Sequence, residues 1–213
     1  MRGRSRRATI REVLDTALEL ERKTMQLYAA LVRSFKDEEP LRSFWFSMAR
    51  HEAGHCGALG LVESLIETDP SLAGNHKVWL ADATVVRLRA LLAAYLREVR
   101  RGVDIRRALE MTLDIESSEL EDVVVDLLQV VTDRRWRDQA VQMLLHDLGD
   151  LSFMIEKYTS DRALLARADE LVERRVGGLR SEATSGKPTS ARSRRPVRAS
   201  ARSSRKGTGR RVP

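Results

Sequence analysis

The sequence predicts an all-α fold, and two observations support this. Glycine and proline are sparse over the first 175 residues, where leucine, alanine, glutamate and arginine dominate, a composition that favours helices over strands. Apolar residues recur at intervals of three and four, which is the period of one face of a helix. Cys56 is the only cysteine, so there is neither a disulfide framework nor a Cys-x-x-Cys metal pair. A chain of 213 residues is long enough for one domain with a sizeable core.

A first helix is predicted from about Thr9 to Lys36, with a turn at residues 37–40 after it. Its apolar face consists of Leu14, Leu18, Met25, Tyr28 and Val32. Pro40 suits the first turn of a second helix, which ends in a loop at residues 68–76. The second apolar face consists of Leu41, Phe44, Met48, Leu59, Val62 and Ile66.

Residues 79–101 have a helical pattern and are predicted to be a long connection to a third helix that begins near Asp104. The third apolar face consists of Ile105, Leu109, Thr112, Leu120, Val123, Leu127 and Val130. After a turn at residues 132–134, a fourth helix presents Trp136, Ala140, Met143, Met154 and Tyr158. A last short helix is predicted over residues 161–175. Two hairpins joined by a long crossover predict a four-helix bundle over residues 10–175.

Positive charge is concentrated at the two ends of the chain. Residues 1–11 contribute +5 and residues 180–213 contribute +10 to a net charge of +7, which leaves −8 for the middle. We predict a basic arm over residues 1–9 and a disordered basic tail over residues 176–213, because the tail has too few apolar residues to form a core. No segment resembles a signal peptide or a membrane span, so we expect a cytoplasmic protein without membrane contact.

The most informative residues are acids that interrupt the apolar faces, because a carboxylate on a buried face needs a compensating partner. Glu52 and His55 are three residues apart and therefore point in one direction. Taken singly, Glu21 or Glu116 could equally be a helix-edge residue whose carboxylate reaches water. The residues that interrupt the four faces are Glu21 in the first helix, Glu52 and His55 in the second, Glu116 in the third, and Asp147 and Asp150 in the fourth.

One cation in the middle of the bundle would neutralise all of these acids. Carboxylate oxygens with one imidazole suit iron, with manganese as the alternative, better than structural zinc, which prefers thiolate and imidazole. The six residues are therefore predicted to be metal ligands for one or two iron ions.

The chain resembles the rubrerythrin branch of the ferritin-like superfamily of di-iron carboxylate proteins. The resemblance covers residues 10–158. Its first half is Glu21 followed by Tyr28, and then the segment 44–48 leading into His51-Glu52-Ala53-Gly54-His55. Its second half begins with Ala108-Leu109 running into Glu116. The resemblance implies a ferritin-like bundle with iron that reduces peroxide or oxidises ferrous iron with oxygen, and pairing of two bundles as a homodimer.

The sequence departs from that family at the fourth helix. Where the family has a second Glu-x-x-His, this chain has Asp147-Leu148-Gly149-Asp150, so the histidine is missing. His146 is a poor substitute because it lies about 100° around the helix from Asp147. A weakened site or a site for a single ion is the expected consequence. A peroxidase cycle would also need an external electron donor, because the rubredoxin cysteines are absent.

Other residues have less specific expected roles. His51, His76 and His146 are predicted to be surface residues, and Cys56 a small buried residue. Tyr28 is expected to pack in the core or to donate a hydrogen bond near the metal.

The alternative function is a bundle without metal that acts as an interaction protein. Its basic tail would contact the phosphates of nucleic acid, although a solvated tail without function is equally consistent with the composition. The segment 176–180 also resembles, weakly, the peptides that load cargo into encapsulin shells.

Overall fold

The computed structural model describes residues 9–75, 82–128 and 134–185. These residues form seven α-helices and one short 3-10 helix, and the described ranges contain no β-strand. The prediction of an all-α fold is therefore confirmed. Parts of the predictions lie outside the described residues. These are residues 1–8 of the predicted arm, residues 186–213 of the predicted tail, and His76.

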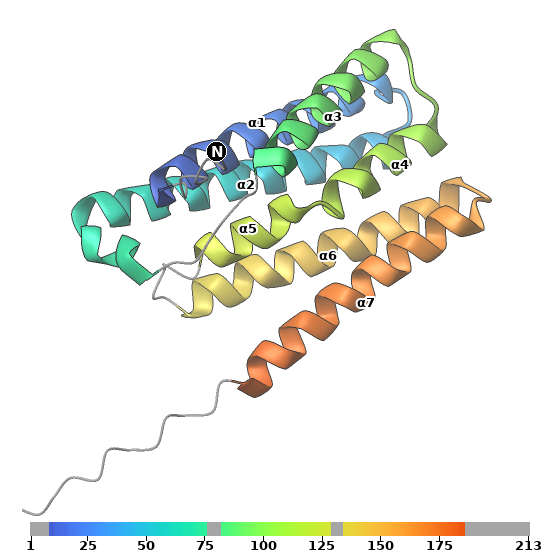
Figure 1. The fold of residues 1–213 in the computed structure, drawn as a ribbon. Helices are drawn as coiled ribbons and strands as arrows, with labels where there is room; N and C mark the ends of the chain where they lie inside the picture. The colour runs from blue at the N-terminus through green and yellow to red at the C-terminus, as the bar shows by residue number, and fades with distance from the viewer. Residues whose placement is uncertain (1–8, 76–81, 129–133, 186–213) are drawn as a thin grey trace, which may run out of the picture.

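Helices α1 (Ile10–Ser34) and α2 (Glu39–Thr68) form an antiparallel hairpin (Figure 1). Helix α1 begins with a capping box, in which the Thr9 hydroxyl accepts a 3.2 Å hydrogen bond from the Glu12 backbone and the Thr9 backbone donates a 2.7 Å bond to the Glu12 carboxylate. Pro40 lies in the first turn of α2, where its missing N–H costs no helical hydrogen bond. Both helices lie where the sequence predicts them, and the 3-10 helix η1 (Pro70–Asn75) follows α2.

Helix α3 (Asp82–Arg101) lies along α1, as Figure 1 shows. Gly102 then turns the chain with a φ of +102°, and the Asp104 carboxylate accepts a 2.7 Å hydrogen bond from the backbone of Arg107 to cap the next helix. The segment predicted as a connection is thus a packed helix in its own right. Its buried residues are Thr84, Val85, Leu88, Leu92, Tyr95 and Val99.

The third predicted helix is divided into α4 (Ile105–Glu116) and α5 (Glu119–Leu128), so the prediction of one continuous helix was wrong. Ser117 and Ser118 separate the two pieces. The Ser118 hydroxyl accepts a 3.4 Å hydrogen bond from the backbone of Leu120, which replaces a helical bond at the start of α5. The break directly follows Glu116, the last residue of α4.

Helices α6 (Arg134–Tyr158) and α7 (Arg162–Ser185) form a second antiparallel hairpin. The Asp161 carboxylate caps α7 by accepting 3.0 Å hydrogen bonds from the backbones of Ala163 and Leu164. Helix α7 continues past the predicted end at residue 175, so the predicted start of the tail at residue 176 falls inside a helix.

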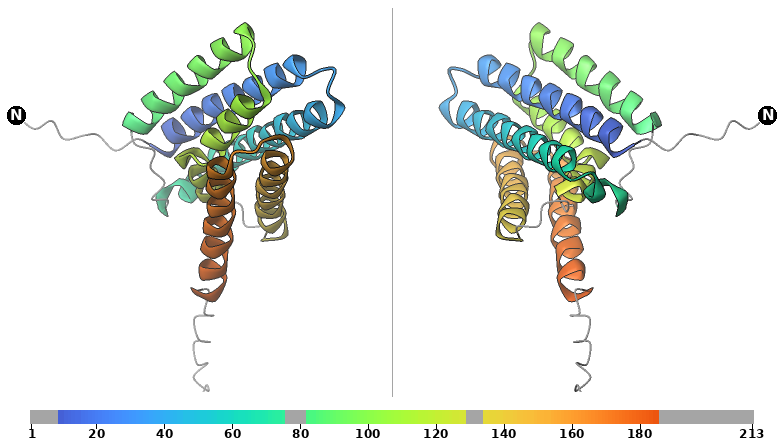
Figure 2. Two further views of the ribbon diagram at one scale, coloured as in Figure 1. Left: turned by 90° about the vertical axis from the view of Figure 1, so that its right-hand side faces the viewer. Right: turned by 90° about the vertical axis from the view of Figure 1, so that its left-hand side faces the viewer.

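Figure 2 shows that the hairpin of α6 and α7 is inclined to the hairpin of α1 and α2. The inward faces of α1, α2, α4, α5 and α6 meet in one core, in which Trp45 and Tyr28 are the largest fully buried side chains. Within the described ranges, every helix is too short or too polar to cross a lipid bilayer.

Candidate metal centre

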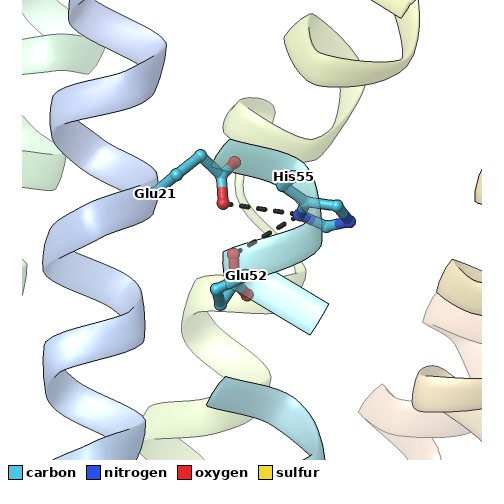
Figure 3. A group of neighbouring side chains, drawn as sticks. All are labelled: Glu21, Glu52 and His55. Atoms are coloured by element: carbon cyan, nitrogen blue, oxygen red, sulfur yellow. Dashed lines mark hydrogen bonds and ion pairs between the residues drawn. The ribbon is translucent and has the colours of Figure 1, made fainter. Parts of the chain in front are cut away.

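Glu21, Glu52 and His55 meet halfway along the hairpin of α1 and α2 (Figure 3). Nδ1 of His55 lies 3.4 Å from Oε2 of Glu21 and 3.4 Å from Oε2 of Glu52. One donor atom of each residue lies within 4.8 Å of the other two. Glu52 and His55 are about one helical turn apart, so both side chains leave the same face of α2 toward Glu21. The structure thus brings together three of the six predicted ligands.

The carboxylates of this cluster are removed from water. Glu21 is 0% exposed and Glu52 is 2% exposed, while the His55 side chain is 15% exposed. Oε1 of Glu21 and Oε2 of Glu52 are buried and make no hydrogen bond within the described part of the chain. An unpaired buried polar atom costs about 1–3 kcal/mol, and more when it is charged. The cluster therefore destabilises the metal-free fold.

The two carboxyl groups differ in their affinity for a proton. Burial and the neighbouring charge of Glu21 raise the pKa of Glu52 well above its usual range. Burial also acts to raise the pKa of Glu21, but its interactions with Glu52 and His55 outweigh burial and lower that pKa. Of the two carboxyl groups, Glu52 is therefore the one that holds a proton more readily. A cation that binds both carboxylates takes the place of this proton.

Glu116 is buried in the same core, where it contacts a tyrosine. It is 2% exposed, and its Oε1 accepts a 2.6 Å hydrogen bond from the hydroxyl of Tyr28, which is 0% exposed. Tyr28 comes from α1, about two turns beyond Glu21. The prediction that Tyr28 packs in the core is confirmed, and the structure adds its hydrogen bond to Glu116.

A second buried hydrogen bond fixes α2 against α4. Nε1 of Trp45 donates to the Thr112 hydroxyl over 3.1 Å, and that hydroxyl donates to the Ala108 carbonyl over 3.0 Å. Because Trp45 and Thr112 are both 0% exposed, this contact joins the two helices that carry Glu52 and Glu116 inside the core.

Asp147 is buried, as predicted, but its contact is with His51. Nδ1 of His51 lies 2.5 Å from Oδ1 of Asp147, and the two residues are 7% and 4% exposed. The prediction that His51 lies on the surface was therefore wrong. His51 is buried because it precedes His55 by four residues, about one turn, on the inward side of α2, and there it meets Asp147 of α6.

Asp150 does not join the buried acids. Its side chain is 50% exposed and lies 3.3 Å from Nδ1 of His146, whose side chain is 73% exposed. The expectation that Asp150 interrupts a buried face was wrong, because the helix turns it toward solvent. His146 is exposed, as predicted. Cys56 is only partly buried, and burial together with the charge of Glu21 raises the pKa of its thiol.

The donor set of the cluster fits a divalent metal ion. Ligands that share one ion at a bond length of about 2.1 Å lie about 3–4 Å from each other, so the observed spacing needs only small side-chain movements. Two carboxylates and one imidazole suit iron or manganese, and a cation would bind Oε1 of Glu21 and Oε2 of Glu52, which make no hydrogen bond within the described residues.

Three comparisons with known proteins found no match. No protein-family model matches the sequence. No curated protein matches it. No solved structure matches the fold. The function of the chain is therefore inferred from the geometry of the cluster.

Proposed function

We propose that this chain is a metal-binding helical bundle of the ferritin-like, rubrerythrin-like type, in which Glu21, Glu52 and His55 hold an iron ion. The observation that carries the proposal is the pair of buried carboxyl groups beside an imidazole, of which Oε1 of Glu21 and Oε2 of Glu52 make no hydrogen bond within the described residues. Protein interiors rarely keep such groups without a compensating charge. Manganese is the alternative metal.

Each residue of the cluster has a distinct part in binding. Glu21 supplies an ionised carboxylate that no water screens. Glu52 gives up its proton when the cation binds, and His55 supplies one neutral ring nitrogen. Tyr28 holds Glu116 in the same core as a further buried carboxylate. The surrounding apolar residues exclude water, which strengthens every one of these electrostatic contacts.

The chemistry of a bound iron would be reduction of peroxide or oxidation of ferrous iron by oxygen, in line with the resemblance of the sequence to rubrerythrins. A peroxidase cycle would draw electrons from an external donor, because Cys56 is the only cysteine in the chain.

Activity measurements on the full chain test this proposal. The protein is loaded with ferrous iron without oxygen, and peroxide consumption and ferrous oxidation are then followed. The site variant is Glu52→Ala/His55→Ala. The control is Glu67→Ala/His146→Ala, which removes the same residue types from positions whose side chains are 56% and 73% exposed.

We expect the wild type and the control to react faster than free iron and the site variant to react like free iron. Equal rates in the wild type and the site variant would contradict the proposal. A wild type that reacts no faster than free iron would also contradict it, and would favour the alternative function of the basic tail on nucleic acid.

A further inference from the structure

The solvent face of α3 is basic, although the middle of the chain is acidic overall. Residues 83–101 include five arginines and one acid, Glu98. All five arginines are exposed, and Glu98 accepts hydrogen bonds of 2.9 and 3.2 Å from Arg107 of α4. Figure 2 shows α3 at the outer edge of the bundle with α1 on its inner side, so the arginines face solvent.

Three of these arginines gather at the C-terminal end of α3. Arg97, Arg100 and Arg101 lie within a sector of about 100° of the helix, on the side opposite the buried Leu92 and Val99. None of the three makes an ion pair with the part of the chain that the structure describes. Positive charge near a helix C-terminus favours the helix dipole, but that effect is confined to the last turn, and Arg97 precedes it.

The acids nearest to this cluster in the sequence already have other partners. Glu98 is paired with Arg107, and the Asp104 carboxylate caps α4. By contrast, Arg89 in the middle of α3 binds Glu19 of α1. The end of α3 is therefore a concentration of positive charge that the described part of the protein does not neutralise.

We infer that Arg97, Arg100 and Arg101 bind the phosphate backbone of duplex DNA without reading its sequence. This contact is separate from the metal centre, and it lies on the folded body and not on the predicted tail. A guanidinium group donates two parallel hydrogen bonds to a phosphate. The three arginines extend over about 6 Å of helix axis, and duplex DNA carries one charge per about 1.7 Å of its axis, so the cluster matches about three phosphates.

The other residues of this face favour a duplex backbone over other partners. Ala90 and Ala93 are small and exposed, and the aromatic residue of α3, Tyr95, is buried. Single-stranded nucleic acid is bound by stacking bases on exposed aromatic side chains, and a lipid surface is bound through large apolar side chains. The large apolar side chain that α3 exposes is Val86, about three turns before Arg97. The cluster thus offers charge and hydrogen bonds, which a duplex backbone accepts.

DNA binding by the full chain tests this inference. Fluorescence anisotropy measures the affinity for a short labelled duplex between about 50 and 200 mM salt. A single strand of the same sequence and vesicles that contain phosphatidylserine are the comparison ligands. The site variant is Arg97→Gln/Arg100→Gln/Arg101→Gln, and a second variant with lysine at the same three positions keeps the charge.

The control variant is Arg42→Gln/Arg162→Gln/Arg174→Gln. It removes the same charge from exposed positions on α2 and α7. Circular dichroism verifies that all three variants fold. The predicted tail is present in every protein, so its contribution is the same in each.

We expect the wild type and the control to bind the duplex more tightly than the single strand. The logarithm of the affinity should fall linearly with the logarithm of the salt concentration, and the slope should be shallower by about 2–3 in the glutamine variant than in the control, because each lost phosphate contact removes about 0.9. The lysine variant should keep the slope of the wild type, since lysine also neutralises phosphate.

Equal slopes in the glutamine variant and the control would overturn the inference and would assign DNA binding to the tail. A wild type that binds the single strand or the vesicles but not the duplex would also overturn it. Neither result affects the proposed function, which is tested by metal loading and activity.

Discussion

Glu21 and Glu52 place two carboxyl groups where the core has almost no contact with water. Such a pair costs free energy in a metal-free protein, because burial disfavours the ionised form of Glu52 and Oε1 of Glu21 makes no hydrogen bond within the described residues. Sites of this kind are expected where stability is given up for binding. A substitution that removes the charge should therefore act in opposite directions on stability and on metal binding.

We predict that Glu52→Gln stabilises the metal-free protein by about 1–2 kcal/mol, because burial raises the pKa of Glu52 and the amide keeps the shape without needing a proton. The same variant should bind metal more weakly than the wild type. Thermal melts with a chelator and with added iron measure both effects. A variant that is less stable than the wild type under chelation would show that the carboxylate has a satisfied structural role.

A second prediction concerns the hydrogen bond between Trp45 and Thr112. Replacing Thr112 by valine leaves the buried indole N–H without an acceptor, which should cost about 1–3 kcal/mol. Thr112→Ser keeps the hydroxyl and is the control, with a smaller loss from the missing methyl group. Urea unfolding of the two variants gives the comparison, and equal losses would mean that the hydrogen bond contributes nothing.

At the scale of single residues, the sequence predicted that the acids Glu21, Glu52 and Glu116 are buried, because each interrupts an apolar face. It misplaced His51, although the spacing of 44, 48, 51, 55, 59 and 62 includes that position in the inward face of α2. It also misplaced Asp150, whose side chain is half exposed although Asp147 three residues before it is buried, because periodicity alone does not resolve a position at the edge of a face.

At the scale of helices, α1, α2 and α6 follow the sequence closely because strong signals mark where they begin. These are the capping box at Thr9, Pro40 and the polar sequence at 132–134. The break between α4 and α5 was missed because Ser117 and Ser118 do not interrupt the apolar period. The only signal for the break is the pair of serine hydroxyls, which compete with the helix for backbone hydrogen bonds.

Gly102 and Gly149 have different backbone conformations, so we predict opposite effects of alanine on stability at the two positions. Gly102 has a φ of +102°, and alanine there should cost about 1–2 kcal/mol through backbone strain. Gly149 is an exposed helical residue with open space around it, so alanine should stabilise α6 by about 0.5–1 kcal/mol. Thermal melts of both variants test this pair, and the same sign of effect in both would contradict the assigned conformations.

At the scale of the whole molecule, charged contacts join helices that are far apart in sequence. Glu19 of α1 binds Arg89 of α3, and Arg167 of α7 donates a 2.6 Å hydrogen bond to Asp114 of α4. Tyr95 of α3 donates to the same aspartate over 2.5 Å. Asp114 thus connects three helices. None of these pairings was visible in the sequence, since exposed charges have no periodic signature.

The contact of Glu19 predicts a pH dependence of stability. Hydrogen bonds from Arg89 and Lys23 lower the pKa of Glu19 from 4.5 to about 2. The stabilisation is therefore present above pH 4.5 and is lost as the pH falls toward 2. Because the side chains of Glu19 and Arg89 are 37% and 43% exposed, Glu19→Gln should cost only about 0.5–1 kcal/mol at pH 7.

Denaturant unfolding of the wild type and Glu19→Gln between pH 7 and pH 3 measures this effect. The difference between the two proteins should shrink as the pH is lowered, and it should also shrink in high salt because the pair is screened. A difference that does not change with pH would show that the loss comes from packing.

Elemental analysis measures whether the buried cluster of Glu21, Glu52 and His55 binds metal. The full chain is purified without a chelator or a metal-affinity tag, next to Glu52→Ala/His55→Ala, and iron and manganese per chain are measured before and after anaerobic loading. We predict at least about one ion per chain in the wild type and none above background in the variant. A wild type without metal after loading, or equal metal in both proteins, would contradict metal binding by this cluster.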